Sequence, residues 1–260
     1  EFTASDDICL GQPATFTDQS TIAQGSITNW YWNFGDGTTD NLTNGDPFTR
    51  SYTNHKTYTV KLVAVSDRGC TSDTVAHQVA VHPLPVTDFS LPAAVCMPGG
   101  TAEFTNHTTI AGGGIWSYEW SFGDGSPDTY TQHASHIFTN SGAYVIRLSA
   151  TSTHGCTHDT TKVFSAFFNK PIARFSAEPD SLCQGAQSEF ADESTSPTGP
   201  INKWNWNFGD GTSSTQSDPV IKYKQPGNYD VQLTVSNEAG CESDIFSKRV
   251  TVYLQPVIDV

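Results

Sequence analysis

The pattern Trp-x-Phe-Gly-Asp-Gly occurs three times in this chain, and its regular spacing limits the possible folds more than any other feature. The copies occupy residues 32–37, 120–125 and 206–211, so they begin 88 and 86 positions apart. A Gly-Cys pair returns with nearly the same period, at residues 69–70, 155–156 and 240–241. This period is too long for one turn of a solenoid but suits a small domain that buries its own core. The sequence therefore predicts three copies of one domain.

The composition favours short strands and an exported protein. The chain holds 21 Gly, 14 Pro and a single Met in 260 residues, which favours strands and turns over helices. A net charge of −14 argues against a nucleic-acid partner, and no apolar run approaches the roughly 18 residues that a membrane-inserted helix needs. The six cysteines, two per repeat, lack the Cys-x-x-Cys spacing of zinc sites. They predict disulfides, and hence a secreted or cell-surface protein.

Proline-containing segments mark the expected domain boundaries. They lie at residues 82–85, 170–171 and 255–256, and prolines in such short linkers stiffen them. The predicted domains are residues 1–84, whose first strand lacks its proline, 85–170 and 171–255. Residues 256–260 repeat the opening of the earlier copies, so we expect a further repeat to begin there and the chain to be one slice of a longer array.

Alternating apolar residues predict the strands within one repeat. In the third copy they cover residues 173–177, 187–192, 203–208, 218–223, 229–236 and 245–252. About seven short antiparallel strands in fewer than ninety residues indicate a two-sheet sandwich of immunoglobulin type. The expected fold is therefore all-β, with three tandem antiparallel β-sandwiches in an extended head-to-tail array.

These residues resemble the PKD domain family, an immunoglobulin-like sandwich named for polycystic kidney disease protein. The family signature continues with an aromatic residue, a glycine and a Tyr-x-Val-x-Leu strand, which the third repeat matches at Tyr223, Gly227 and residues 229–233. In the first repeat Lys56 stands at the glycine position, so its turn is expected to differ. The cysteine and Pro-Leu-Pro pattern is similar to arrays on large secreted surface proteins of Bacteroidota. The resemblance implies non-catalytic spacers or adhesion modules, often beside enzymes.

The signature has a structural explanation and a functional alternative. The tryptophans are expected to fill the space between the sheets, and the tyrosine that opens the later strand is expected to pin a corner of the sandwich. These core residues are Trp32, Trp120, Trp206, Tyr58, Tyr144 and Tyr229. The turn aspartates Asp36, Asp124 and Asp210 are the alternative, as calcium ligands. Calcium takes about six or more oxygens, and the flanking residues are mostly Thr, Ser and Gly, so the structural interpretation is preferred and no other cofactor is expected.

Other motifs point to modification rather than catalysis. No nucleophile motif, phosphate loop or repeated carboxylate pair occurs. His154 and His158 flank Cys156 in a pattern like a metal cluster, although an exposed hairpin tip explains them more simply. Three short sequences are similar to the O-glycosylation sequon of Bacteroidota surface proteins. Their acceptor residues are Thr74, Thr160 and Ser181.

Two disulfide patterns are open. The within-repeat pattern joins Cys9–Cys70, Cys96–Cys156 and Cys183–Cys241, and the pattern across repeats joins Cys9–Cys156 and Cys96–Cys241. The two cysteines of one repeat are expected at opposite ends of a strand of roughly 30 Å, whereas a disulfide needs Cα atoms within about 7 Å. This favours pairing across repeats, with Cys70 and Cys183 facing further domains. The within-repeat pairs become possible again if the first strand is broken and its cysteine lies further along the sheet, toward the hairpin cysteine of the same repeat.

Two functions fit the sequence. The first is a structural spacer array of a surface adhesin or a filament, whose partners are neighbouring repeats or identical subunits. The second is an accessory module of a secreted enzyme that binds surface glycans or proteins. The second function requires an exposed aromatic platform, for which the candidates are Trp30, Trp116 and Trp204.

Overall fold

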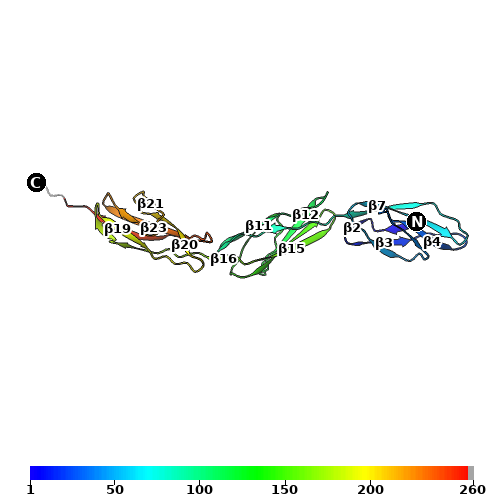
Figure 1. The fold of residues 1–260 in the computed structure, drawn as a ribbon, viewed down its shortest axis with the longest axis horizontal. Helices are drawn as coiled ribbons and strands as arrows, with labels where there is room; N and C mark the ends of the chain where they lie inside the picture. The colour runs from blue at the N-terminus through cyan, green and yellow to red at the C-terminus, as the bar shows by residue number, and fades with distance from the viewer. Residues whose placement is uncertain (257–260) are drawn as a thin grey trace. The chain divides into compact units, whose positions relative to one another are not determined.

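The computed structural model describes residues 1–256, and within this range every regular element is a β-strand (Figure 1). The described residues form two compact units. One unit contains Glu1–Ser90, Thr105–Ala134 and Ile146–Lys162, and the other contains the remaining described residues. The division passes through the second repeat, whereas the first and third repeats each lie mainly within one unit. The further repeat expected at residues 256–260 falls, after Pro256, outside the described residues.

The first repeat folds into two sheets. One sheet has the order β1 (Phe2–Ala4), β3 (Pro13–Asp18), β6 (Phe48–Ser51). The other has the order β2 (Asp7–Cys9), β8 (Val75–His82), β7 (Thr57–Ser66), β4 (Ile27–Asn33), β5 (Thr39–Leu42). Alternate residues of β7 are buried, which is the period of a strand with one face against a core. The two inner faces together form the sandwich.

Aromatic rings from both sheets fill the core of this sandwich. The Trp32 ring lies 4.9 Å from Phe2 and 5.7 Å from Phe16, both in edge-to-face geometry. All three side chains are buried, and Phe34 extends the cluster from the same strand end as Trp32. Edge-to-face pairs add to the free energy gained by burying such large apolar rings. The signature tryptophan therefore occupies the space between the sheets.

The third repeat has the same strand order. One sheet contains β17 (Phe175–Glu178), β19 (Gln187–Asp192) and β22 (Val220–Lys222). The other contains β18 (Ser181–Cys183), β24 (Phe246–Tyr253), β23 (Gly227–Asn237), β20 (Ile201–Asn207) and β21 (Ser213–Ser214). Trp206 is fully buried, with its ring 4.9 Å from Phe175 and 5.6 Å from Phe190. The core of the first repeat is thus reproduced.

The strands of the second repeat follow the same plan, with the last strand divided in two. They are β9 (Phe89–Ser90), β10 (Val95–Met97), β11 (Thr101–Asn106), β12 (Ile115–Ser121), β13 (Ala134–Ile137), β14 (Tyr144–Ser152), β15 (Thr157–Phe164) and β16 (Phe167–Asn169). Their sheets have the orders β13-β11-β9, β12-β14-β15 and β10-β16. Trp120 is fully buried, 5.1 Å from the ring of Phe89.

The predicted all-β fold of three tandem immunoglobulin-like sandwiches is confirmed, with one local difference in each repeat. A short strand that the sequence did not reveal (β2, β10 or β18) pairs in parallel with the last strand, whereas the other strand pairs are antiparallel. In the first and third repeats the chain therefore leaves the first sheet after its opening strand and joins the second, whereas in the second repeat β10 and β16 form a separate two-stranded sheet. This change of sheet positions the first cysteine of every repeat.

Candidate functional site

The Gly-Asp-Gly turns have the geometry that the signature predicts. In the first repeat Gly35 and Gly37 have φ of 75° and 93°, which residues with a Cβ rarely adopt. The Asp36 carboxylate accepts hydrogen bonds from the Thr38 backbone N–H at 3.0 Å and from its hydroxyl at 2.6 Å. Asp124 with Ser126, and Asp210 with Thr212, repeat this arrangement. One oxygen of each aspartate thus closes its own turn, and calcium binding there stays a prediction.

The first turn also carries an ion pair. Arg50 donates from Nη2 to Asp36 Oδ2 at 2.8 Å, and its guanidinium lies 4.1 Å from the centre of the Phe34 ring. Burial acts to raise the pKa of Asp36, but the hydrogen bonds from Thr38 and Arg50 outweigh it and lower the pKa to about 2. Asp36 is therefore held ionised as part of the first sandwich.

The three predicted corner tyrosines make the same contact. The hydroxyls of Tyr58, Tyr144 and Tyr229 donate to backbone carbonyls four residues upstream, at 2.8, 3.0 and 2.8 Å. Lys56, which replaces the family glycine, places its Nζ 4.7 Å from the Tyr58 ring centre. Among the described residues positive φ is confined to glycines, so Lys56 accommodates the turn without left-handed backbone.

Two disulfides join cysteines of consecutive repeats. Cys9 is bonded to Cys156 and Cys96 to Cys241, with Cα–Cα distances of 5.5 and 5.4 Å. We call them the first and second bridge. They follow the pattern across repeats that strand length favoured, even though the opening strand is broken. Cys70 and Cys183 are exposed thiols in the described structure.

The register of the short parallel strand explains why the cysteines of one repeat stay apart. Cys9 lies opposite His82, the last residue of β8. Cys70 lies in the hairpin that precedes β8, which has eight residues and spans roughly 26 Å at about 3.3 Å per residue. The break in the opening strand thus moves Cys9 to the far end of the sheet, rather than toward Cys70.

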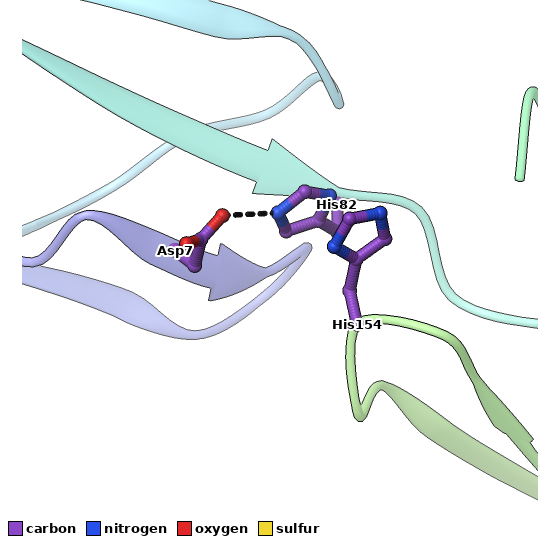
Figure 2. A group of neighbouring side chains, drawn as sticks. All are labelled: Asp7, His82 and His154. Atoms are coloured by element: carbon purple, nitrogen blue, oxygen red, sulfur yellow. Dashed lines mark hydrogen bonds and ion pairs between the residues drawn. The ribbon is translucent and has the colours of Figure 1, made fainter.

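A cluster of three ionisable side chains adjoins the first bridge. Figure 2 shows Asp7 and His82 on neighbouring strands, with His154 reaching them from the hairpin after β14. His82 Nε2 lies 2.5 Å from Asp7 Oδ1, and the rings of His82 and His154 stack with centroids 3.7 Å apart and planes 10° from parallel. His82 is half-buried, whereas Asp7 and His154 are exposed. All three belong to the same compact unit.

The sequence pointed to only part of this cluster. It placed His154 and His158 beside Cys156, but His158 Nδ1 lies 2.7 Å from the Thr87 hydroxyl instead. Asp7 and His82 were missed, because only the parallel pairing of β2 with β8 brings them together. Two signals were present in the sequence, since Asp7 and His154 each stand two residues before a cysteine.

The second bridge has different surroundings. The residues that correspond to Asp7, His82 and His154 are Ala94, Phe168 and Ala239, by their positions relative to the bonded cysteines. Near this bridge Asn237 donates from Nδ2 to the carbonyls of Asn169 and Thr198, at 3.1 and 2.9 Å. The second bridge is therefore surrounded by apolar side chains and by the Asn237 amide, which is hydrogen-bonded to nearby backbone carbonyls.

The tryptophans before the signature divide into two groups. The indole N–H groups of Trp30 and Trp204 donate to Asp18 and Asp192, at 2.6 and 2.7 Å, which ties both rings to the sandwich. Trp116 lies where the β12–β14 register shifts, and it is 77% exposed. Among the glycosylation candidates Thr74 and Ser181 are exposed, and Thr160 is half-buried.

Facing β-sheets with this strand order place the chain in the class of immunoglobulin-like sandwich proteins. The chain belongs to the PKD domain family, whose model matches residues 1–81, 82–166 and 169–252. Within residues 1–256 there is no helix with the length and apolar character needed to cross a membrane.

Its relatives are much larger proteins. The chain is 42% identical over 66 residues to Collagenase ColA of Bacillus cereus, which covers 25% of this chain and 7% of that protein. It is 33% identical over 82 residues to the pre-pro-metalloprotease PrtV of Vibrio cholerae, covering 32% and 8%. The crystal structure of the PKD1 domain of PrtV is 30% identical, with a TM-score of 0.29, and covers 32% of this chain and 96% of that domain. The chain thus matches only a small part of these proteases.

Proposed function

We propose that this chain is a non-catalytic, extracellular spacer array that forms part of a surface adhesin or a filament. The observation that carries the proposal is the pair of bridges, each of which bonds the short-strand cysteine of one repeat to the hairpin cysteine of the next. Such bonds limit the separation of consecutive domains, which is a mechanical rather than a catalytic role. We place the domains at residues 1–84, 85–170 and 171–255, with linkers stiffened by proline.

The two free thiols indicate how the array continues. Cys183 occupies the short-strand position of Cys9 and Cys96, and Cys70 occupies the hairpin position of Cys156 and Cys241. By the same rule, Cys183 bonds to the hairpin cysteine of a following repeat and Cys70 to the short-strand cysteine of a preceding one. The partner is then a neighbouring repeat or another copy of this chain. Disulfides of this kind require an oxidising compartment, which supports the extracellular assignment.

Controlled oxidation of the concentrated chain tests this rule. We expect disulfide-linked chains of many copies, with a Cys70–Cys183 peptide in non-reducing digests and filaments in electron micrographs. An equimolar mixture of the Cys70→Ser and Cys183→Ser variants should stop at dimers. Each single variant alone, like the double variant, should remain monomeric, because no Cys70–Cys183 bond can form. Oxidised oligomers that lack the Cys70–Cys183 peptide, or monomers at every concentration, would contradict the proposal.

A second candidate function is a binding module of a secreted protease. The similarity to a collagenase and a metalloprotease supports it, and so does Trp116, because a 77% exposed indole offers a flat apolar surface to a sugar ring or a peptide. Glycan arrays and binding to fibrillar collagen test this candidate. Binding that Trp116→Ala abolishes would favour it, with Trp204→Ala as the control. If no glycan on the glycan array binds and collagen does not bind either, the binding-module function is contradicted and the spacer function is retained.

Surface modification is a separate proposal. We expect O-glycans on Thr74, Thr160 and Ser181, of which the first and last are exposed. Mass spectrometry of the protein purified from its natural host tests the three residues individually. Unmodified peptides covering all three would contradict the assignment.

A further inference from the structure

We propose that Asp7, His82 and His154 form a binding site for a divalent transition-metal ion of the Zn²⁺ class. Each residue offers one ligand atom, and these atoms lie within 4.8 Å of one another. Two imidazole nitrogens and a carboxylate oxygen make a donor set that Zn²⁺ accepts, at ligand distances of about 2.0–2.2 Å. Three protein ligands leave the fourth tetrahedral position to water.

Binding one ion requires movements of the exposed side chains. Ligand atoms around a tetrahedral Zn²⁺ lie roughly 3.4 Å apart, which follows from ligand distances of about 2.1 Å. The 2.5 Å separation between His82 Nε2 and Asp7 Oδ1 therefore has to open slightly when an ion enters. The Asp7 side chain is 66% exposed and the His82 side chain 16%, so Asp7 is free to move around a fixed imidazole.

The stacked rings of His82 and His154 have to separate before both can bind one ion. An imidazole nitrogen binds a metal ion through a lone pair in the plane of the ring, and two rings with centroids 3.7 Å apart and planes 10° from parallel direct these lone pairs side by side rather than at one point. Because His154 is exposed on its hairpin, its ring is free to rotate out of the stack while the half-buried His82 stays in place.

The first bridge organises the three ligands. Asp7 lies two residues before Cys9 on the same strand, so the two side chains share a face. His82 is the strand partner of Cys9, and His154 lies two residues before Cys156. The Cys9–Cys156 bond therefore fixes the strand that carries Asp7 close to the hairpin that carries His154. The backbone segments that carry the ligands are thus already held together, so less conformational entropy is lost on metal binding than in an unbridged protein.

The second bridge shows that a bridge of this geometry does not need these residues. Its corresponding positions hold Ala94, Phe168 and Ala239, and its Cα–Cα distance differs by only 0.1 Å. The Asp-His-His set is therefore a feature of the first bridge alone among the described pairs. A bound ion there would act as a second, reversible cross-link between the two repeats that Cys9 and Cys156 already join.

Zn²⁺ titration of the oxidised chain tests the site. Because free thiols also bind Zn²⁺, the chain should carry Cys70→Ser and Cys183→Ser and no affinity tag. Isothermal titration then gives stoichiometry and affinity, and Co²⁺ absorption reports the coordination geometry. The test variant is His154→Ala, since an exposed hairpin side chain can be removed without disturbing a core. The matched control is His55→Ala, another exposed histidine in a turn.

We expect one Zn²⁺ per chain in the parent and in His55→Ala, and binding at least about tenfold weaker in His154→Ala. Asp7→Ala and His82→Ala should weaken it similarly, with peptide mapping to show that Cys9 and Cys156 remain bonded. Equal affinities of the parent and the variant lacking all three ligands would overturn the proposal. An equal loss in His55→Ala would do the same. Neither result would affect the spacer function, which rests on the disulfides.

Discussion

The first and second bridges have the same backbone geometry but opposite side-chain chemistry. Their Cα–Cα distances are 5.5 and 5.4 Å, and in both a short parallel strand supplies one cysteine and a hairpin supplies the other. Ionisable residues surround the first, and Ala94, Phe168 and Ala239 surround the second. The strand register alone is thus sufficient to place a bridge. The neighbouring positions differ between the two bridges, and at the first bridge they hold an aspartate and two histidines.

The exposure of the hairpin cysteines extends this comparison. The bonded Cys156 and Cys241 are only 1% and 0% exposed to solvent, whereas the unbonded Cys70 is exposed. All three hairpins have a Gly-Cys pair, and Gly69, Gly155 and Gly240 share a positive φ near 80°. The hairpin conformation is therefore the same with and without a bonded partner. The hairpin half of a bridge is thus preformed in each of the three repeats.

Removing a disulfide bridge should have the largest effect on stability, and the loss should be equal for the first and the second bridge. We expect Cys9→Ser with Cys156→Ser, and Cys96→Ser with Cys241→Ser, each to lower the free energy of unfolding by about 4–5 kcal/mol. The reason is that the bonds close loops of 147 and 145 residues in the unfolded chain. Guanidinium unfolding at neutral pH measures the loss, with Cys70→Ser as the control. A Cys9–Cys70 peptide in a non-reducing digest would contradict the pairing itself.

Transplanting the ligands should convert the second bridge into the first. The variant Ala94→Asp, Phe168→His, Ala239→His is expected to bind a second Zn²⁺, with affinity raised at least about tenfold over the parent second bridge. Titration in the Cys70→Ser, Cys183→Ser background measures the stoichiometry. A variant with Ala94→Asn, Phe168→Leu and Ala239→Gln serves as the size-matched control. If this variant is folded, keeps both disulfides and still binds only one Zn²⁺ per chain, the backbone around a bridge is not sufficient to assemble the site.

The two regions also show what the sequence can reveal. Trp206 and its Gly-Asp-Gly turn were predictable because a buried aromatic and positive-φ glycines act within a few residues of one another. The short strand β2 was not, because three residues carry too little periodicity to indicate a partner 73 positions away in the chain. The Asp7–His82 contact depends on that pairing, and the His154 contact depends on the bridge as well. Sites assembled by long-range pairing are therefore the part that a single sequence hides.

A smaller contrast separates the sandwiches that carry the bridges. Arg50 pairs with Asp36 in the first repeat, whereas the same register position in the third repeat holds Ile221. We expect Arg50→Ile to lower the stability of the first repeat by about 1 kcal/mol at pH 7. Because folding lowers the pKa of Asp36 to about 2, its contribution is complete above about pH 4 and is lost as the pH falls toward 2.

Unfolding curves of the parent and Arg50→Ile between pH 2 and 7 measure this difference. The two curves should converge near pH 2, where Asp36 becomes protonated in both proteins. Lys61→Ile, at an exposed position of β7, is the control for removing a positive charge. A difference that stays constant down to pH 2 would assign the effect to the packing of Arg50 on Phe34 instead.

The smallest expected effect is that of Asp7→Asn without metal. Asp7 is 66% exposed, and ion pairs of exposed groups contribute about 0–1 kcal/mol, so we expect the stability of the metal-free protein to fall by less than about 1 kcal/mol. With Zn²⁺ in excess the difference should grow, because the parent gains binding free energy that the variant lacks. Thermal unfolding in EDTA and in Zn²⁺ measures both differences. A large loss of stability in EDTA would mean that Asp7 supports the first bridge structurally. The second bridge has no such support, because its corresponding residue is Ala94. A small loss in EDTA that widens with Zn²⁺ would instead assign the polar cluster to ligand binding, with the disulfide alone holding the repeats.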